Sequence, residues 1–521
     1  MRRTRVAVIG AGIGGLSAAI DLARQGHEVT VLERARTPGG KMREIAIGEQ
    51  RLDAGPTVFT LKRVFDGLCH EAGTTLEQHV RLQPMRTLAR HGWAGDGRLD
   101  LFADVEQSTD AIGRFAGKAD ALGFRAFCAR SRRIFETLDD TFMQAQRPGV
   151  VELTRRVLPL GFGALWGITP FTRMWNALGG HFRDVRLRQL FGRYATYCGS
   201  SPFQAPATLM LVAHVEQEGV WMVEGGMHQL ARALETVAHA QGATFRYGAE
   251  VRAIRSDGGR VTGVDLADGE RLEVDAVVAN ADVAALAAGH FGDAARRAVP
   301  AMPRTARSLS ALTFSLVART RGFPLLRHTV FFSSDYPAEF RAIFREQRLP
   351  DEPTVYICAH DRADVDATAP QDAERLLCLV NAPARGDTQP FDDEEIERCA
   401  ERTFRHLASL GLEVERTPDR TVTTSPTTFD RLFPATGGAL YGRASHGWMA
   451  SFQRPGAITK LAGLFLAGGS THPGPGVPMA AISGRLAAAA AADYLASTRR
   501  SHPVAIAGGT STRSATTAPV V

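Results

Sequence analysis

The cysteines of this 521-residue chain are few and stand far apart. There are six, at positions 69, 128, 198, 358, 378 and 399, and no two form a C-x-x-C pair. A zinc site or a disulfide framework needs closely spaced or paired cysteines. The scattered pattern argues against both, so no metal site is predicted, and it suits the reducing conditions of a cytoplasm.

Long apolar runs and basic clusters are also missing. No stretch holds 18 uninterrupted apolar residues, so no spanning helix is expected. The first residues do not read as a signal peptide, because glycines interrupt the apolar run at positions 10–15. The net charge is +6, but lysine occurs only at positions 41, 62, 118 and 460, and no basic run indicates nucleic acid. The arginine excess fits either a compositional bias or a surface that faces anionic lipid.

The strongest motif lies at the start of the chain. A β-branched strand is followed by G-x-G-x-x-G at residues 10–15, then by a helix and a second strand that ends on Glu33. In such a unit Gly10 makes the tight turn, Gly12 lets the backbone approach a pyrophosphate, and Gly15 lets helix and strand pack closely. The helix N-terminus attracts the pyrophosphate, and Glu33 can accept from the ribose hydroxyls. The motif therefore predicts FAD or NAD rather than NADP.

Two further turns follow this unit. Pro38-Gly39-Gly40-Lys41 exposes backbone N–H groups next to a cation. This suits a second clamp on a cofactor phosphate better than an ordinary surface turn. The turn at residues 51–57 contains Gly55, whose lack of a side chain would let a flat ring approach.

The middle of the chain predicts a mixed α and β region. Residues 61–142 read as mostly helical with a strand pair near 86–102, and residues 244–273 read as a β-meander. Residues 150–178 combine aromatic and apolar side chains with flanking arginines, which suits a membrane interface and buried core helices equally well. Strands of a second sheet are expected at residues 308–317, 354–359 and 376–381.

A second glycine-rich loop lies near the end of the chain. Residues 463–467 read as a short strand, residues 468–478 form a Gly- and Pro-rich loop, and an alanine-rich helix follows to about residue 495. This repeats the strand–loop–helix order of the N-terminus. The helix N-terminus would favour negative charge, such as a reduced flavin's ring edge. Residues 497–521 are rich in Ser, Thr, Ala, Gly and Pro and are expected to be disordered.

Together, the N-terminal motif, the Pro38–Lys41 turn and the C-terminal loop resemble the bacterial-type carotenoid desaturases, which are relatives of phytoene desaturase. The resemblance spans residues 1 to about 496. Its most specific part is the loop Thr-His-Pro-Gly-Pro-Gly-Val-Pro at residues 471–478, which separates this branch from amine oxidases and protoporphyrinogen oxidases. Within the branch, the chain is most similar to the hydroxyneurosporene (methoxyneurosporene) desaturases, which introduce a 3,4 double bond into acyclic 1-hydroxycarotenoids.

The resemblance implies an α/β flavoprotein. Its Rossmann-like FAD-binding domain, of the amine-oxidase and GDI type, would carry an inserted α+β substrate domain. The FAD-binding domain would combine residues 1–70, 220–300 and 425–496. Residues 71–219 and 301–424 would form the substrate and membrane-facing domain.

The resemblance also implies which residues hold FAD. The wider superfamily uses an acid in the C-terminal loop to hold the ribityl chain, whereas this chain has Gly468-Gly469-Ser470 there, so a backbone N–H or the Ser470 hydroxyl would replace it. Val251 would meet the adenine through its backbone. The residues expected to hold FAD are Gly10, Gly12, Gly14, Gly15, Glu33, Arg34, Gly40, Lys41, Gly55, Pro56, Val251, Gly468, Gly469, Ser470, Gly476 and Val477.

The implied reaction removes a hydride and a neighbouring proton from the carotenoid, with flavin N5 as the hydride acceptor. His472 is the candidate for a catalytic polar contact near the flavin, although it could instead shape its loop by hydrogen bonding. Trp166, Phe171, Trp175 and Trp221 are the candidates for substrate or membrane contact.

The expected partners are a carotenoid, a membrane surface bound without a spanning helix, and oxygen or a quinone as electron acceptor. The expected location is cytoplasmic, on the face of the inner or photosynthetic membrane. No nucleic acid is expected.

Several alternatives stay open. The same scaffold supports phytoene desaturation, carotenoid isomerisation and ketolation. A non-enzymatic prenyl-lipid carrier of the GDI type would not need the phosphate glycines or Glu33, which this chain keeps. An amine oxidase would need an aromatic cage, which only seven tyrosines disfavour.

Overall fold

The computed structural model describes residues 3–95, 97–160, 171–368 and 370–500. Its first unit is a sheet of five parallel strands in the order β10-β2-β1-β14-β22. The strands come from distant parts of the chain, so this sheet joins the N-terminal motif to the C-terminal loop. Their bounds are β1 Arg5–Ile9, β2 Glu28–Glu33, β10 Thr244–Tyr247, β14 Ala276–Ala279 and β22 Leu464–Leu466.

Alternating side chains of β1 build two cores, one on each face of this sheet. Val6 and Val8 pack with the helices α1 (Ile13–Arg24), α10 (His228–Ala240) and α16 (Val477–Arg500). Ala7 and Ile9 pack with a three-stranded sheet on the opposite face. That sheet consists of β11 (Val251–Asp257), β12 (Arg260–Leu266) and β13 (Arg271–Glu273).

The prediction of one meander over residues 244–273 is wrong for its first strand. β10 pairs with β2 in parallel, with Thr244 opposite Thr30, and only β11 to β13 form the meander. The reason is that β10 follows α10, and a helix that crosses over one face of a sheet returns the chain to a parallel position.

A sheet of seven strands forms the second unit, in the order β21-β15-β19-β18-β17-β7-β8. The strand pair expected near residues 86–102 is present, and β7 pairs with β17 in parallel, so distant segments share this sheet too. The bounds are β7 Thr87–Trp93, β8 Gly97–Phe102, β15 Ser310–Ala318, β17 His328–Phe331, β18 Val355–Ala359, β19 Glu374–Ala382 and β21 Thr421–Thr424.

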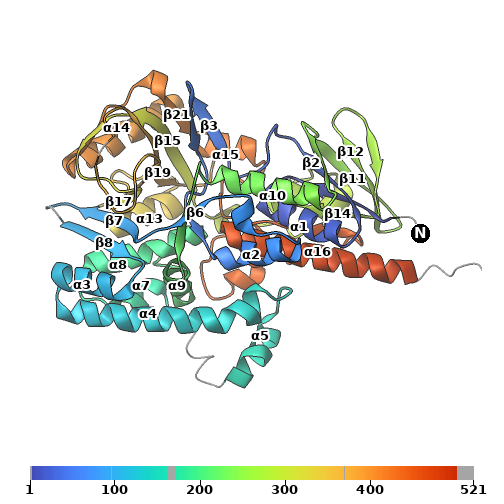
Figure 1. Ribbon diagram of the computed structural model, residues 1–521, viewed down its shortest axis with the longest axis horizontal. Helices are drawn as coiled ribbons and strands as arrows, with labels where there is room; N and C mark the ends of the chain where they lie inside the picture. The colour runs from blue at the N-terminus through green and yellow to red at the C-terminus, as the bar shows by residue number, and fades with distance from the viewer. Residues whose placement is uncertain (1–2, 96, 161–170, 369, 501–521) are drawn as a thin grey trace, which may run out of the picture.

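The two faces of the seven-stranded sheet have different neighbours. In β19, Leu376, Cys378 and Val380 pack toward α14 (Asp393–Ser409), whereas Leu377 and Leu379 face a large cavity. Figure 1 shows this sheet and α14 on one side of the molecule and the five-stranded sheet on the other.

Helices and short strands complete the fold. Figure 1 shows α5 projecting from the body below the long helix α4. Three short strands, β5 (Phe59–Thr60), β9 (Val220–Val223) and β6 (Leu82–Pro84), form a small sheet between the two units. The other helices discussed below are α2 Lys62–Glu71, α4 Lys118–Leu138, α5 Val150–Val157, α7 Met174–Gly179, α9 Leu211–Gln217 and α11 Val283–Ala287. Because α16 runs to Arg500, residues 497–500 belong to this helix and not to the predicted tail, and residues 501–521 lie outside the described part.

Candidate functional site

A cavity of about 1030 Å³ lies between the two sheets. It starts at the carboxyl ends of β1, β2 and β14, lined there by Ile9, Leu32 and Asn280. It reaches the inner face of the seven-stranded sheet at Leu377 and Leu379. A pocket for one drug-sized ligand usually measures about 300–1,000 Å³. A cavity of this size suits a site where a cofactor and a substrate share one continuous space.

The glycine-rich loop leaves room at one end of this cavity because side chains do not fit there. Gly10 has a φ of +96°, and its N–H donates to the Leu32 carbonyl at 2.8 Å. A Cβ on Gly12 would lie 2.7 Å from Oδ1 of Asn280, and a Cβ on Gly15 would lie 2.0 Å from the Gly10 oxygen. The glycines therefore keep α1 close to β1 and leave its N-terminus open toward the cavity, as the motif predicts.

Glu33 ends β2 with a buried carboxylate beside this loop. Its Oε2 accepts the Ala11 N–H at 2.7 Å, and its Oε1 accepts the Ala35 N–H at 2.8 Å. Arg34 and Val251 line the cavity next to it. The carboxylate thus lies at the end of the cavity where the motif places an adenosine ribose.

The Pro38–Lys41 turn packs directly on the glycine-rich loop. The Gly39 N–H donates to the Ala11 carbonyl at 2.8 Å, and a Cβ on Gly40 would lie 3.2 Å from the Cα of Gly12. Two backbone segments therefore meet with almost no side chain between them. Close backbone approach of this kind leaves room for a phosphate beside the two loops.

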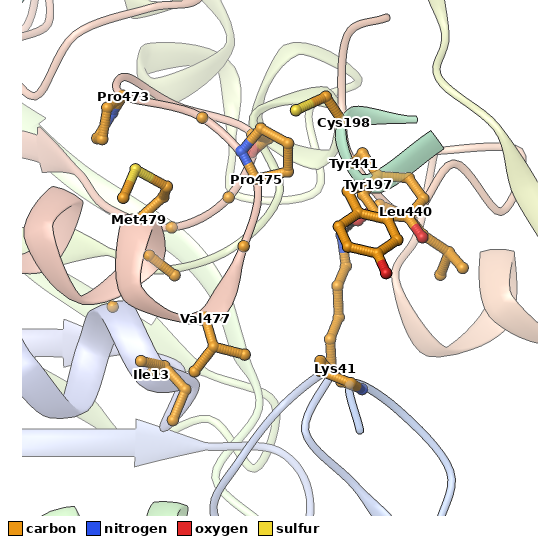
Figure 2. Close-up of a pocket in the computed structure, with 18 of the residues that line it drawn as sticks. Ile13, Lys41, Tyr197, Cys198, Leu440, Tyr441, Pro473, Pro475, Val477 and Met479 are labelled. Carbon is orange, nitrogen blue, oxygen red and sulfur yellow. Dashed lines mark hydrogen bonds between the residues drawn. The ribbon is translucent and has the colours of Figure 1, made fainter. Parts of the chain in front are cut away.

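Lys41 extends from this turn toward the C-terminal part of the chain, as Figure 2 shows. Its Nζ donates to the Leu440 carbonyl at 2.9 Å and lies 3.6 Å from Oδ2 of Asp282. Burial lowers the pKa of Lys41, and the attraction of Asp282 offsets this only in part. The side chain lines the cavity, so it presents a positive charge to whatever binds there.

The C-terminal loop lines the cavity beside the N-terminus of α1, where Val477 lies near Ile13 in Figure 2. The Ser470 hydroxyl accepts the Val283 N–H at 3.1 Å and so caps α11. Gly468 donates its N–H to Ser483 Oγ at 3.1 Å. The loop is therefore held by its own polar contacts while its backbone lines the cavity.

Arg454 stabilises this loop through hydrogen bonds to backbone carbonyls. Its Nη1 donates to the Tyr441 carbonyl at 3.0 Å and to the Gly469 carbonyl at 3.2 Å. The side chain is almost fully buried, and burial lowers the pKa of Arg454 to about 10. Its cost of burial is offset by several carbonyl acceptors.

Comparison with known proteins identifies the family. The model of the family described as flavin containing amine oxidoreductase matches residues 13–492. The chain belongs to this family.

Individual relatives are more specific than the family model. The chain is 52% identical to a hydroxyneurosporene desaturase of Rubrivivax gelatinosus, over 99% of this chain and 98% of the relative. It is 31% identical to a 1-hydroxycarotenoid 3,4-desaturase of a Flavobacterium species, over 92% and 97% of the two chains. The fold matches cyclohexylamine oxidase from Brevibacterium oxydans with a TM-score of 0.56 and 16% identity, over 95% and 100% of the chains. These findings confirm the predicted fold class, the FAD cofactor and the resemblance to carotenoid desaturases.

The cavity fits FAD at its glycine-rich end. The N-termini of α1 and α16 both point into it, and any side chain at Gly12 or Gly40 would fill the space beside them. Helix N-termini with free N–H groups favour a pyrophosphate. The carboxylate of Glu33 at the end of β2 adds an acceptor for ribose hydroxyls.

Most of the predicted FAD contacts line the cavity. Gly15 is the exception, because its role is the close packing of α1 on β1. The assignment of single residues as FAD ligands stays a prediction. Those that line the cavity are Gly10, Gly12, Gly14, Glu33, Arg34, Gly40, Lys41, Gly55, Pro56, Val251, Gly468, Gly469, Ser470, Gly476 and Val477.

His472 makes the contacts of one of its two predicted roles, the shaping of its loop by hydrogen bonding. Its Nε2 donates to the carbonyls of Phe142 at 2.9 Å and Ala145 at 3.0 Å, and its ring meets the Phe142 ring edge-on. The side chain is 2% exposed, and burial lowers its pKa to about 4. The ring is therefore neutral with its proton on Nε2, and it holds the C-terminal loop to the segment that follows α4. These contacts fit the loop-shaping role, and a catalytic contact of His472 stays a prediction.

The aromatic candidates divide into two groups. Phe171 is 75% exposed, lines the cavity and lies 5.2 Å from the Trp448 ring. Trp175 packs on Phe203 with ring centres 4.7 Å apart, and Trp221 packs on Phe59. Neither tryptophan is among the described residues that line the cavity, and both are half-buried, so their contact with substrate or membrane stays a prediction. Trp166 lies outside the described residues.

Some cavity residues were missed from the sequence. Asn280 and Asp282 follow the buried strand β14 at its carboxyl end, which is a readable signal for a ligand site in a parallel sheet. Arg193, Tyr197 and Tyr356 lie in the inserted segments, where no motif marked them.

Proposed function

We propose that the protein is an FAD-dependent desaturase that introduces the 3,4 double bond into an acyclic 1-hydroxycarotenoid such as 1-hydroxyneurosporene. The observation that carries the proposal is one cavity that joins the two flavin loops to an apolar space. Leu209, Val212, Leu377 and Leu379 line this space. The named relatives act on a substrate of this class according to their names.

In this proposal the chain binds both partners and excludes water. The glycine loops, Glu33 and Lys41 hold the cofactor, which supplies a two-electron acceptor for a hydride when bound. The apolar walls hold the long substrate against it, which is a matter of proximity and orientation. The same walls keep water from a carbon that develops positive charge. The FAD-binding domain comprises residues 1–70, 220–300 and 425–496, and the two insertions form the substrate domain.

The test is to supply the purified protein and FAD with phytoene, neurosporene and 1-hydroxyneurosporene and to follow product absorption. We expect conversion of 1-hydroxyneurosporene to a product with a longer conjugated chain, absorbing at longer wavelength. Conversion of phytoene alone would contradict the assignment of a 1-hydroxycarotenoid as the substrate. Products that carry an added oxygen would favour ketolation instead.

We further propose that the enzyme takes its substrate from a membrane surface through the cavity mouth beside α5. Within the described residues, no helix is long and apolar enough to span a bilayer. Val151 on α5 is 84% exposed and Phe171 is 75% exposed. Arg155 adds positive charge on α5, whereas Arg156 pairs with Glu152 at 2.8 Å. An apolar surface with flanking arginines suits an anionic lipid interface. The segment of residues 150–178 therefore serves neither of its two predicted roles as a whole. Val151 and Phe171 are exposed, whereas Met174 and Leu178 of α7 are fully buried in the core.

A double substitution tests this surface without changing a residue of α7. We expect Val151→Glu combined with Phe171→Ser to weaken flotation with phosphatidylglycerol vesicles while the bound flavin spectrum stays unchanged. Val365→Glu is the matched control, since Val365 is 59% exposed on the opposite unit. Equal flotation of both variants would place the membrane contact elsewhere.

A further inference from the structure

We propose that Arg193 donates a hydrogen bond to the oxygen on C1 of the substrate and thereby selects carotenoids with an oxygenated end. This inference rests on the proposed function and names the residue that gives it its specificity.

Arg193 starts the short helix η4 (Arg193–Cys198) and lines the cavity within its apolar half. Its Nη1 donates to the Tyr197 hydroxyl at 3.0 Å, and its guanidinium carbon lies 5.3 Å from the centre of the Tyr356 ring. Among the described residues no carboxylate forms an ion pair with it. The aromatic faces stabilise the charge without using its N–H groups.

A guanidinium carries five N–H donors, and the hydrogen bond to Tyr197 is the one that Arg193 makes with its side chain in the described part of the chain. The remaining donors belong to a side chain that is only half-buried and faces the cavity. Donors left without an acceptor in an apolar space are costly. A ligand oxygen would remove this cost, whereas an unoxygenated hydrocarbon would not.

Two polar side chains near Arg193, Glu216 and Tyr356, already have hydrogen-bond partners. Glu216 accepts the Tyr194 hydroxyl at 2.6 Å. The Tyr356 hydroxyl lies 2.6 Å from Thr57 Oγ1 and 2.8 Å from His328 Nδ1. Burial raises the pKa of Glu216. Arg193 is therefore a charged donor with capacity for a ligand.

Arg193, Tyr197 and Tyr356 form a cluster in the cavity. Through Tyr356, this cluster lies next to the flavin end of the cavity. This side chain, against which Arg193 lies, bonds to Thr57. Thr57 directly follows Gly55 and Pro56, the turn predicted to meet the flavin ring.

The second link runs through η4. A Cβ on Gly199, which follows η4, would lie 2.6 Å from Cδ2 of Tyr441. Tyr441 adjoins Leu440, whose carbonyl accepts from Lys41. Figure 2 shows Tyr197 and Tyr441 near the Nζ end of Lys41.

Substrate chemistry requires this proximity. The oxygen on C1 is within about 4 Å of C3 and about 5 Å of C4, because each connecting single bond is about 1.5 Å long. A group that binds this oxygen must therefore lie close to the reacting carbons and not at the far end of the cavity. A hydroxyl and a methoxy oxygen both accept hydrogen bonds, so a donor at Arg193 serves both.

The test compares three substrates, 1-hydroxyneurosporene, its 1-methoxy ether and neurosporene, with the FAD-loaded parent protein and with Arg193→Met and Arg193→Lys. We measure kcat/KM and, separately, the dissociation constant from the change in flavin absorbance on binding. We expect the parent to prefer both oxygenated carotenoids by about 10- to 100-fold, the range for a charged hydrogen bond. Arg193→Met should lose this preference with little change for neurosporene, and Arg193→Lys should keep part of it.

Arg405→Met, on the exposed face of α14, is the control and should keep the parent's preference. If the parent converts 1-hydroxyneurosporene but Arg193→Met keeps the full preference, the inference fails and the proposed function stands. If the parent converts none of the three, the proposed function fails, and the binding constants still decide whether Arg193 reads the oxygen. A preference for the hydroxyl but not for the ether would assign the contact to an acceptor and overturn the proposal. If Arg193→Met does not retain FAD, Tyr197→Phe replaces it, because loss of the hydroxyl that orients Arg193 should lower the same preference.

Discussion

The carboxylate of Glu33 is tied to the glycine-rich loop before any ligand reaches it. Through Ala11 it holds the loop at the spacing that the cavity needs, and through Ala35 it orders the chain after β2. At the residue scale, one side chain thus shapes the backbone of the site and offers an acceptor to a ribose.

We expect Glu33→Gln to weaken FAD binding by about 10- to 100-fold, because hydrogen bonds to a charged acceptor contribute about 1.5–3 kcal/mol. The amide would also turn donor atoms toward backbone N–H groups. Quenching of FAD fluorescence on titration measures the affinity. Glu28→Gln, exposed at the start of the same strand, is the control. Equal affinities in both variants would remove Glu33 from the site.

His472 makes a prediction about acid stability. Its pKa is lowered from 6.5 to about 4, so between these values the unfolded chain binds a proton that the folded chain does not. The free energy of unfolding therefore falls as the pH drops from 6.5 toward 4 and is unaffected by this group above 6.5. In His472→Gln an amide can donate to the same carbonyls without titrating. We expect the melting temperature of the parent to fall more than that of the variant over this window. Parallel melting curves would show that His472 does not titrate in this way.

At the scale of elements, the contact between α1 and α16 joins the two ends of the described chain. A Cβ on Gly484 of α16 would lie 2.0 Å from the Gly14 carbonyl oxygen. Arg485 reinforces the contact through Asp21 at 3.1 Å. Both helices can therefore direct their N-termini into one cavity only because this crossing is free of side chains.

We expect Gly484→Ala to lower the free energy of unfolding by about 1–3 kcal/mol, because overpacking forces the helices apart. We also expect the variant to release FAD. Gly67→Ala in α2 is the matched substitution, because its Cβ would meet only Arg485 Nη1 at 3.8 Å. Replacing a helical glycine by alanine there should stabilise the chain by about 0.5–1 kcal/mol. Thermal melting with and without FAD separates the two. Similar melting temperatures would mean that α16 can shift away from α1.

The sequence predicts the elements that lie next to a glycine-rich motif. It does not predict the positions of elements that depend on segments far away in the chain. The strands β1, β2 and β22 and the loops after them follow from glycine spacing and apolar runs, which are local signals. The partner of β10 depends on α10 lying over the sheet, which only the assembled fold decides. Aromatic content likewise could not tell the packed Trp175 from the exposed Phe171, because composition does not report which neighbour covers a side chain.

At the scale of the whole molecule, the cavity is lined by both units and by segments from residue 9 to residue 480. A cofactor bound there would contact parts of the chain that otherwise meet through few elements. Binding to the folded state alone stabilises it by about 2.7 kcal/mol when the free ligand is at 100 times its dissociation constant.

We therefore expect removal of FAD to lower the melting temperature and addition of FAD to raise it in a concentration-dependent way. Differential scanning calorimetry of the stripped and reloaded protein measures this. A melting temperature independent of FAD concentration would contradict a site that spans both units.

The strand order β10-β2-β1-β14-β22 also bears on how the protein is made. β1 is translated first, yet its sheet is complete only after β22 at Leu464–Leu466 has left the ribosome. At about 5–20 residues per second, the face of β1 that packs with α16 waits roughly 20 to 90 s for this last partner. During this time it is a natural client for a chaperone, and a nascent chain stalled before β22 should be unable to retain flavin. Flavin retention should therefore require β22 and the loop that follows it.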